Sequence, residues 1–251
     1  MKLKDKVAII TGGGGGIGRV VCLRFAEEGA KLAILDFDKE AAQEAAQLVN
    51  DAGGTARVWT ADITDSDAVD RVVGEIWDKF GTVDILVNTA GIFRGAKVHE
   101  FPNDSWQETI DVNLNGTMYC TRAVTKIWMD RKMPGRVINF GSLSSYVAVE
   151  GSGAYCAAKA AVLLYTRVAG LELARYGINV NCVAPGPVDT PMLDQSVRTS
   201  PEREAEWLAK MPIGRFLKPE EIAAVVTFLA SDDASSLVGE CIACDGGYVI
   251  Q

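Results

Sequence analysis

The sequence lacks the residues and runs on which several large protein classes depend. It has a single histidine, His99, with no cluster of acidic or cysteine residues beside it, so a histidine-based catalytic triad is not expected. No apolar run of about 18 residues occurs, and the apolar stretch after the basic start "MKLKDK" is too short for a signal-peptide core. We therefore expect a soluble cytoplasmic protein that does not bind a membrane.

Positive charge is also scarce. The 251 residues include 25 lysines and arginines against 33 aspartates and glutamates, which gives a formal net charge of −8. Nucleic acids and anionic membranes attract proteins with excess positive charge, so neither is expected as a partner. Internal repeats, low-complexity tracts and linkers are missing as well, and 48% of the residues are apolar. This composition predicts a single globular domain over residues 1–251.

The six cysteines are scattered except for "CIAC", from Cys241 to Cys244. Such a pair raises the question of a redox or zinc site. The surrounding "GECIACDGG" has the pattern of a short strand, on which residues three apart point to opposite faces. Thiols on opposite faces are poorly placed to form a disulfide or to share a metal ion. We interpret them as buried structural thiols and predict no metal site.

Short apolar runs alternate with helical patterns along the whole chain. The expected strands are 6–11, 31–36, 56–62, 83–91, 135–142, 178–186 and 240–245. The expected helices are at about 17–29, 38–54, 65–80, 104–130, 152–176 and 219–231. This alternation predicts an α/β fold, a doubly wound parallel sheet with helices on both faces. The least regular segment, 186–214, has four prolines and no clear strand, and we expect it to form a substrate lid.

Five consecutive glycines stand in "ITGGGGGIGRV", residues 9–19, between the first expected strand and the first expected helix. A flexible linker would not be framed in this way, so we infer that bare backbone approaches a ligand here. A helix N-terminus offers free amides and partial positive charge to a pyrophosphate. Two dinucleotide-binding patterns fit. They are G-x-G-x-x-G through Gly13, Gly15 and Gly18, and T-G-x-x-x-G-x-G through Gly12, Gly16 and Gly18.

An acidic residue, Asp36, ends the second expected strand, 18 residues after Gly18. A carboxylate there can accept hydrogen bonds from the adenosine ribose of NAD, and it would repel the 2′-phosphate of NADP. Its alternative role is to cap the helix that starts near Asp38. The glycine loop contains no basic residue, and Phe37 follows Asp36. We therefore predict a Rossmann-type sheet of about seven strands that binds NAD.

Tyr155 and Lys159, in "YCAAK", stand four residues apart on an expected helix and so share one face. Acid–base chemistry near neutral pH requires the tyrosine pKa, ordinarily about 10, to fall to about 7. A lysine ammonium and a positive nicotinamide ring on that face both favour the phenolate. The alternative is an ordinary amphipathic helix with a partly buried tyrosine, because Y-x-x-x-K is frequent by chance.

Together and in this order, these motifs resemble the short-chain dehydrogenase/reductase family over essentially the whole chain. "TGGGGGIG" is similar to its cofactor loop, and "NTAG" (88–91) is similar to its N-N-A-G element with Thr89 in place of the second asparagine. "ADITD" resembles the segment whose Asp62 holds the adenine amino group, and "DVNLNG" supplies Asn113. Ser142 precedes Tyr155 by 13 residues, as the catalytic serine of the family does. "PGPVDTPM" resembles the loop that meets the nicotinamide carboxamide, and "CDGGY" resembles the D-G-G element.

The resemblance implies a role for each residue of a catalytic set, namely Asn113, Ser142, Tyr155 and Lys159. Tyr155 would exchange a proton with the substrate oxygen during hydride transfer, and Ser142 would hydrogen-bond that oxygen. Lys159 would lower the tyrosine pKa and bind the nicotinamide ribose, and Asn113 would anchor a water on the proton path. The implied cofactor contacts are Gly12, Gly15, Gly16, Ile17, Gly18, Asp36, Phe37, Asp62, Ile63, Asn88, Ala90, Gly91, Tyr155, Lys159, Pro185, Gly186, Val188 and Thr190.

The resemblance also implies an assembly. The family commonly forms a homotetramer, in which the helices at about 104–130 and 152–176 would pair across an interface. Relatives that end in glutamine sometimes place a divalent ion near that carboxylate, so Gln251 leaves a structural metal ion open.

The substrate would meet residues after "NTAG", residues after the serine and the expected lid. The candidates are Phe93, Arg94, Ser142, Ser144, Tyr146, Val149, Tyr155, Met192, Leu193 and Trp207. This largely apolar and aromatic set favours an aromatic or alicyclic secondary alcohol or its ketone. Packing of the lid alone would explain the same composition.

Three other functions stay open. "PIGRFLKPEEIA" is similar to 3-oxoacyl-[acyl-carrier-protein] reductases, which generally use NADP and dock an acidic carrier through arginines. Asp36, Met133 and Tyr176 argue against that function, although Arg131 and Arg175 lie close by. A polyol or sugar dehydrogenase would need a more polar pocket. A catalytically silent NAD-binding protein conflicts with the intact catalytic set.

Overall fold

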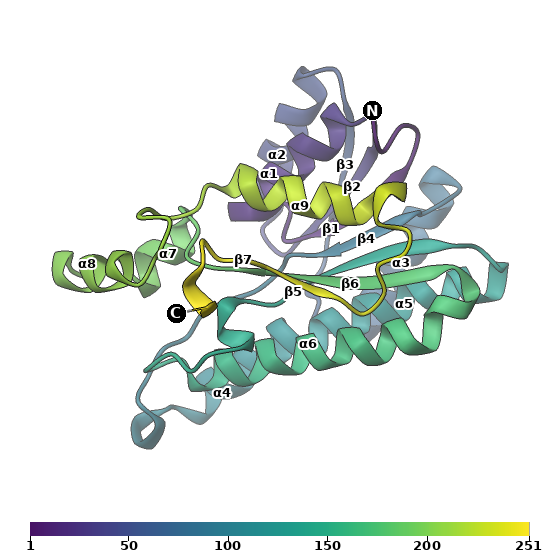
Figure 1. The fold of residues 1–251 in the computed structure, drawn as a ribbon. Coiled ribbons are helices and arrows are strands. Elements are labelled where there is room, and N and C mark those ends of the chain that lie inside the picture. The colour runs from purple at the N-terminus through teal and green to yellow at the C-terminus, as the bar shows by residue number, and fades with distance from the viewer. Residues whose placement is uncertain (251) are drawn as a thin grey trace.

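The computed structural model describes residues 1–250 and contains one seven-stranded sheet (Figure 1). Gln251, and with it the metal ion considered there, lies outside the described residues. The strands are β1 (Val7–Thr11), β2 (Lys31–Asp36), β3 (Thr55–Thr60), β4 (Ile85–Asn88), β5 (Gly135–Phe140), β6 (Ile178–Pro185) and β7 (Cys241–Cys244). Their order is β3-β2-β1-β4-β5-β6-β7, and all neighbours are parallel. The Rossmann-type fold and its expected strands are confirmed.

The central strands are buried because both faces of the sheet are covered. All five residues of β1 and all eight of β6 are buried. Successive residues enter opposite cores, so that Ile10 packs in one cluster and Ile9 in the other. A strand buried on both sides need not show the polar alternation of a half-exposed one, and β1 does not. In β6 two polar residues are buried, Asn179 and Asn181, and their amides both donate to the Leu237 carbonyl oxygen.

Helices cover both faces of the sheet (Figure 1). The cluster with Ile10 includes residues of α1 (Gly16–Glu27), α2 (Lys39–Asp51) and α9 (Pro219–Ala230). The cluster with Ile9 includes residues of α3 (Ser66–Phe80), α5 (Thr117–Arg131) and α6 (Gly153–Leu173). The expected helix at 152–176 thus corresponds to α6 followed by a 3₁₀ turn, Ala174–Tyr176.

Local capping fixes where several helices begin and end. Asp65 accepts hydrogen bonds from the amides of Asp67 (3.0 Å) and Ala68 (3.1 Å) at the start of α3. The same helix ends at Gly81, whose φ of 75° is left-handed and suits glycine.

The long helix expected before β5 is interrupted. α4 (Asn103–Ile110) passes into a π-helical turn, Asp111–Gly116, and then into α5. The Asn113 amide donates to the Thr109 carbonyl oxygen at 2.9 Å, and the Thr117 hydroxyl donates to the Asn113 carbonyl oxygen at 2.9 Å. Side chains thereby compete for carbonyls of the helix, which favours the wider turn. The expectation of one continuous helix is wrong at this turn.

The irregular segment 186–214 contains two short helices, α7 (Pro191–Ser196) and α8 (Pro201–Ala209). Each begins with proline, at a position where the missing amide hydrogen has no cost. Figure 1 shows both helices projecting beyond the end of the sheet. None of the described helices is long and apolar enough to cross a membrane.

The expected strand at "CIAC" is β7, and the thiols of Cys241 and Cys244 are free. Both residues are partly rather than fully buried. Within residues 1–250, no group of three or more histidine, cysteine or acidic side chains is arranged to hold a metal ion.

The strand order reverses at β1, with β2 on one side and β4 on the other. In sheets of this kind, a crevice opens beyond the carboxyl ends of the strands at the reversal. The glycine loop follows β1, and residues 89–91 follow β4, so the topology brings both segments to that crevice.

Candidate active site

The glycine loop between β1 and α1 distinguishes the two glycine patterns. Gly12 (φ 64°) and Gly16 (φ 47°) have left-handed backbone, which favours glycine. A Cβ at Gly18 would collide with the carbonyl oxygen of Gly12 and would lie 2.9 Å from Thr89 Oγ1. By contrast, nothing lies within 4 Å of a Cβ placed at Gly15. The geometry therefore matches T-G-x-x-x-G-x-G.

The same loop presents backbone amides to the crevice. Gly15 is the N-cap of α1, and the helix begins at Gly16. The first amides of a helix have no partner within it and carry partial positive charge. This end of α1 is thus suited to an anionic group such as a pyrophosphate.

Asp36 ends β2 beside the glycine loop. Its carboxylate accepts hydrogen bonds from the amides of Gly14 (2.8 Å) and Asp38 (3.0 Å). Asp38 itself caps α2 by accepting from the Ala41 amide at 3.0 Å. The alternative role considered for Asp36, that of the helix cap, is therefore taken by Asp38.

A cavity of about 880 Å³, the acidic cavity, follows the crevice past this loop. The predicted cofactor residues that line it are Gly12, Gly15, Gly16, Ile17, Gly18, Asp36, Phe37, Asp62, Ile63, Ala90, Gly91 and Thr190. Its lining carboxylates are Asp36, Asp38, Asp62, Asp104, Glu108 and Asp111. Within residues 1–250, no lysine or arginine lines this cavity. The lining therefore offers an anionic group backbone amides and neutral polar side chains rather than cationic side chains.

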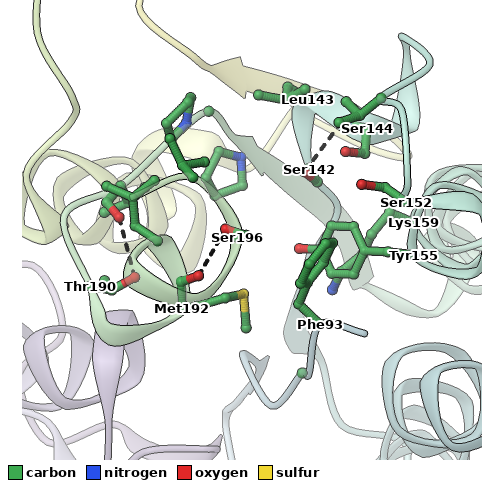
Figure 2. Close-up of a pocket in the computed structure, with 18 of the residues that line it drawn as sticks. Phe93, Ser142, Leu143, Ser144, Ser152, Tyr155, Lys159, Thr190, Met192 and Ser196 are labelled. Carbon is green, nitrogen blue, oxygen red and sulfur yellow. Dashed lines mark hydrogen bonds between the residues drawn. The ribbon is translucent and has the colours of Figure 1, made fainter. Parts of the chain in front are cut away.

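A second cavity of about 150 Å³, the apolar cavity, adjoins the first (Figure 2). The predicted residues that line it are Gly91, Phe93, Ser142, Ser144, Val149, Tyr155, Lys159, Pro185, Gly186, Val188, Thr190, Met192, Leu193 and Trp207. Figure 2 shows Ser142, Tyr155 and Phe93 on one side of the space and Met192 and Ser196 on the other. Segment 186–214 thus forms one wall.

Tyr155 lies in the first turns of α6, next to Ser142, which follows β5. Burial raises the pKa of Tyr155 to about 12, and a hydrogen bond with Ser142 opposes that rise. The Phe93 ring meets the Tyr155 ring edge-on, with centroids 5.6 Å apart. The hydroxyls of Ser142 and Tyr155 are therefore brought together beside an apolar wall.

Lys159 lies one helical turn after Tyr155 and is 4% exposed. Its Nζ donates to the Phe140 carbonyl oxygen at 2.9 Å and lies 5.5 Å from the centre of the Tyr155 ring. Burial lowers the pKa of Lys159 to about 8. The same burial that raises the pKa of Tyr155 thus weakens the positive charge on Lys159.

Asn113 sits in the π-helical turn and is completely buried. Its amide donates to the carbonyl oxygens of Ile92 and Thr109, both at 2.9 Å, while Oδ1 has no partner among the described residues. A Cβ at Gly91 would lie 2.7 Å from this Oδ1 and 3.6 Å from Lys159 Nζ. Gly91 thus allows the Asn113 oxygen to approach the lysine, and a buried acceptor there suits a bound polar group.

Asn88 lines neither cavity, although it was predicted to contact cofactor. Its amide donates to Thr121 Oγ1 at 3.1 Å and to Asn139 Oδ1 at 2.9 Å. These bonds tie β4 to α5 and β5. A short motif cannot distinguish a ligand contact from such a structural bond.

Tyr146 and Arg94 also lie outside the apolar cavity. The Tyr146 hydroxyl donates to the Cys241 carbonyl oxygen at 3.0 Å, so its ring is held against β7. The Arg94 guanidinium forms two hydrogen bonds of 2.9 Å with the Glu108 carboxylate. Neither residue lines the cavity in which we expected the substrate to bind.

Three polar residues of the apolar cavity were missed by sequence reasoning. Ser152 precedes α6, Ser196 ends α7, and Arg203 belongs to α8. Arg203 stands in "PEREAE", which has the mixed charge of a solvated helix face. Only the placement of α8 beside the cavity distinguishes this arginine from a surface charge.

Comparisons with known proteins agree with this geometry. The family model described as "Enoyl-(Acyl carrier protein) reductase" matches residues 13–249. A 3-oxoacyl-[acyl-carrier-protein] reductase from Thermotoga maritima is 38% identical over 100% of both chains. The chain belongs to the short-chain dehydrogenase/reductase family. Members of the family are oxidoreductases that bind a nicotinamide cofactor, so this short-chain dehydrogenase/reductase is one too.

Two solved structures are similar throughout. One, from Beutenbergia cavernae, was proposed to be an NAD(P)-dependent gluconate 5-dehydrogenase and holds NADP at low occupancy. It is 34% identical, with a TM-score of 0.94, over 100% of this chain and 99% of its own. The other, levodione reductase, is 32% identical, with a TM-score of 0.95, over 99% of both chains. The residues of the acidic cavity fit such a cofactor, because glycine backbone and the start of α1 can receive its pyrophosphate.

Proposed function

We propose that this short-chain dehydrogenase/reductase interconverts a hydrophobic secondary alcohol and its ketone with NAD. The observation that carries the proposal is the meeting of Ser142, Tyr155 and Lys159 in the apolar cavity, next to the acidic cavity. An aromatic or alicyclic substrate suits the side chains that line the apolar cavity, namely Phe93, Val149, Met192, Leu193 and Trp207. We propose that segment 186–214 acts as a lid within a single domain.

The choice of NAD rests on the charge of the acidic cavity. Asp36 is held by two backbone amides, and no cationic side chain lines this cavity within residues 1–250. A carboxylate in this position accepts hydrogen bonds from ribose hydroxyls and repels a 2′-phosphate. NADP is bound by a similar protein, so the preference is a property to be measured for this chain.

The bound cofactor supplies the hydride acceptor. Ser142 holds the substrate oxygen, and Tyr155 removes the hydroxyl proton as the carbonyl forms. In the reverse direction, Tyr155 returns the proton. Because the pKa of Tyr155 is raised to about 12, the residue is a proton donor in the absence of added positive charge. Oxidation therefore requires positive charge near the tyrosine.

Lys159 and Asn113 support this step. Lys159 would bind the nicotinamide ribose and provide positive charge beside the tyrosine. Asn113 would anchor a water that connects the site to solvent, through the unpartnered Oδ1 next to Lys159. Lys159 would thus stabilise the charged form of Tyr155, and Asn113 would connect Tyr155 to solvent for proton exchange.

A reductase of 3-oxoacyl thioesters is the second candidate, favoured by the name of the Thermotoga maritima relative. A polyol or sugar dehydrogenase is a third, favoured by the gluconate dehydrogenase similarity. The apolar lining argues against polyols, and the acidic cavity argues against NADP-linked thioester reduction. A catalytically silent NAD-binding role is the least consistent with the site.

We also propose a homotetramer. The outer face of α6 exposes Leu164, Val168 and Leu171, with 60%, 46% and 82% of each residue accessible. An apolar row of this kind on a helix favours contact with another subunit. Light scattering of the purified protein measures the assembly directly.

The test of function is reduction of NAD or NADP over a panel of alcohols. The panel holds aryl-alkyl, alicyclic, polyol and 3-hydroxyacyl thioester compounds. Turnover of aryl or alicyclic alcohols with NAD supports the proposal. Preference for the thioester with NADP contradicts it and supports the second candidate.

Tyr155→Phe tests the role of the hydroxyl. Loss of general acid–base catalysis should lower kcat by roughly 10³-fold, while calorimetry should still detect NAD binding. Tyr165→Phe is the matched control, because it removes a hydroxyl from the same helix that instead bonds Thr121. Equal activity in both variants would exclude Tyr155 as the acid–base group.

A further inference from the structure

The apolar cavity differs in charge from the chain as a whole. The protein carries a formal net charge of −8. Yet the charged side chains that line this cavity within residues 1–250 are both cations, Lys159 and Arg203. An apolar space with cations and no lining carboxylate favours a ligand that is itself negative at one point.

The two cations are not equivalent. Lys159 is buried, donates to the Phe140 carbonyl oxygen and lies under the Tyr155 ring, so it belongs to the reacting end of the cavity. Arg203 comes from α8, on the opposite wall, and is half-buried. A charge at the second position is not needed for proton transfer at Tyr155.

Arg203 is held in place but leaves donors free. Its amide donates to Ser200 Oγ at 3.2 Å, at the start of α8, and its Nε donates to the Ser196 carbonyl oxygen at 3.0 Å. The Nε bond ties the guanidinium to the last residue of α7. The two terminal nitrogens, Nη1 and Nη2, have no hydrogen-bond or ion-pair partner among the described residues.

Arg198, in the same segment, shows the contrast. Its guanidinium contacts three carboxylates, Asp189 at 2.6 Å, Asp194 at 3.2 Å and Glu204 at 3.2 Å. Arg198 is saturated by the protein, whereas Arg203 lines the cavity and its outer donors have no partner among the described residues. A guanidinium of this kind binds a carboxylate in a planar, charge-assisted pair.

We propose that Arg203 is a specificity-determining residue that binds a carboxylate on the substrate, away from the carbon that is oxidised. The substrate class is then a compact hydroxy acid or keto acid with an apolar body, which matches a cavity of about 150 Å³. This inference rests on the proposed function, because it assigns the second end of the same substrate.

The experiment measures binding rather than turnover. Isothermal titration calorimetry in the presence of saturating NAD, and in parallel of NADP, compares carboxylates with their neutral amides. The probe pairs are benzoate with benzamide, cyclohexanecarboxylate with its carboxamide, and 3-phenylpropionate with its amide. Sulfonate and phosphate analogues of the best acid distinguish a carboxylate site from a general anion site.

The wild-type protein should bind at least one carboxylate roughly 10-fold or more tightly than its amide, as expected for a hydrogen bond to a charged group. Arg203→Gln should reduce that ratio to within about 2-fold, while Arg203→Lys should retain part of it. Lys218→Gln is the control, since it removes one positive charge from an exposed residue outside the cavity lining. Its ratio should equal that of the wild type.

Several outcomes overturn the inference. It is wrong if no carboxylate binds better than its amide, if the preference persists in Arg203→Gln, or if Lys218→Gln abolishes it equally. It is also wrong in its ligand class if phosphate or sulfonate is preferred over carboxylate.

Turnover separates this failure from failure of the proposed function. Oxidation of neutral alcohols without any carboxylate preference would sustain the function and reject the role of Arg203. Arginine-dependent carboxylate binding without turnover of any alcohol would do the reverse.

Discussion

The acidic cavity and the apolar cavity meet at Gly91 and Thr190, yet they are built on opposite principles. The acidic cavity would hold anionic groups with backbone, through glycines that allow the chain to come close, and its charged side chains are carboxylates. In the apolar cavity the charged groups are two cationic side chains within an apolar wall. Backbone amides serve any ligand with the same phosphates, whereas side chains can change with the substrate. Of the two cations in the apolar cavity, Lys159 belongs to the catalytic set implied by the family, and Arg203 does not.

Cofactor binding by the glycine loop should be the property most sensitive to the addition of a single carbon atom. Gly18→Ala places a Cβ against the Gly12 carbonyl oxygen and 2.9 Å from Thr89 Oγ1. The displaced loop should weaken NAD binding by roughly 10²-fold, corresponding to overpacking of about 3 kcal/mol, as measured by calorimetry.

Gly74→Ala is the control for this substitution. Gly74 lies inside α3, and nothing lies within 4 Å of a Cβ built there. NAD affinity should be unchanged and stability should rise by about 1 kcal/mol. If Gly18→Ala binds NAD as tightly as Gly74→Ala does, NAD binding does not depend on the close approach of Gly18 to Gly12.

Lys159 tests the effect of burying a cation in the apolar cavity. Burial lowers its pKa to about 8 from an ordinary 10.5. Between these values the unfolded chain binds a proton that the folded chain does not, so stability gains with rising pH across that window. The free energy of unfolding of the wild type should rise relative to Lys159→Met by on the order of 3 kcal/mol.

Urea denaturation of both proteins at several pH values between 7 and about 10.5 measures this difference. Tyr155 and Cys182 adjoin Lys159. Burial raises the pKa of Tyr155, and a hydrogen bond with Cys241 together with burial raises that of Cys182. The charge on Lys159 opposes the rise at Cys182, so the measured difference contains this coupling as well as the titration of Lys159. A difference that does not vary with pH would mean that Lys159 is solvated like a surface lysine.

Changing the charge at positions 36 and 37 should change the cofactor preference, and this is the smallest of the three expected effects. Asp36→Ser combined with Phe37→Arg removes a carboxylate that repels a 2′-phosphate and adds a cation beside it. The ratio of NADP to NAD affinity should increase by roughly 10-fold or more. Phe37→Ala is the control, because Phe37 is 77% exposed and carries no charge. An equal ratio of NADP to NAD affinity in the double variant and the wild type would show that Asp36 does not determine the cofactor preference.

Much of the fold was predictable because it depends on local patterns. Buried parallel strands appear as largely apolar runs, and β1 is an example. Tyr155 and Lys159 were found because a spacing of four places both on one face of α6. The glycine loop and Asp36 were found because they follow consecutive strands of a parallel sheet.

Other features depend on tertiary placement that no short motif encodes. Asn88 and Tyr146 stand within or beside recognised motifs, but the Asn88 amide nitrogen and the Tyr146 hydroxyl donate to neighbouring elements of the fold. Arg203 resembles an exposed charge in the sequence, and only the position of α8 brings it to a cavity. The pKa of Tyr155 likewise follows from burial, which the Y-x-x-x-K spacing does not measure.

The π-helical turn between α4 and α5 determines which residues of α5 face the sheet. An α-helical residue advances about 100° around the axis, so one extra residue in a turn rotates the following helix by about that angle. Removal of a single residue from Asp111–Gly116 would restore an unbroken helix and would turn Asn113 or the α5 face that packs on the sheet away from its partners. The length of this six-residue stretch is therefore as much a part of the site as its side chains.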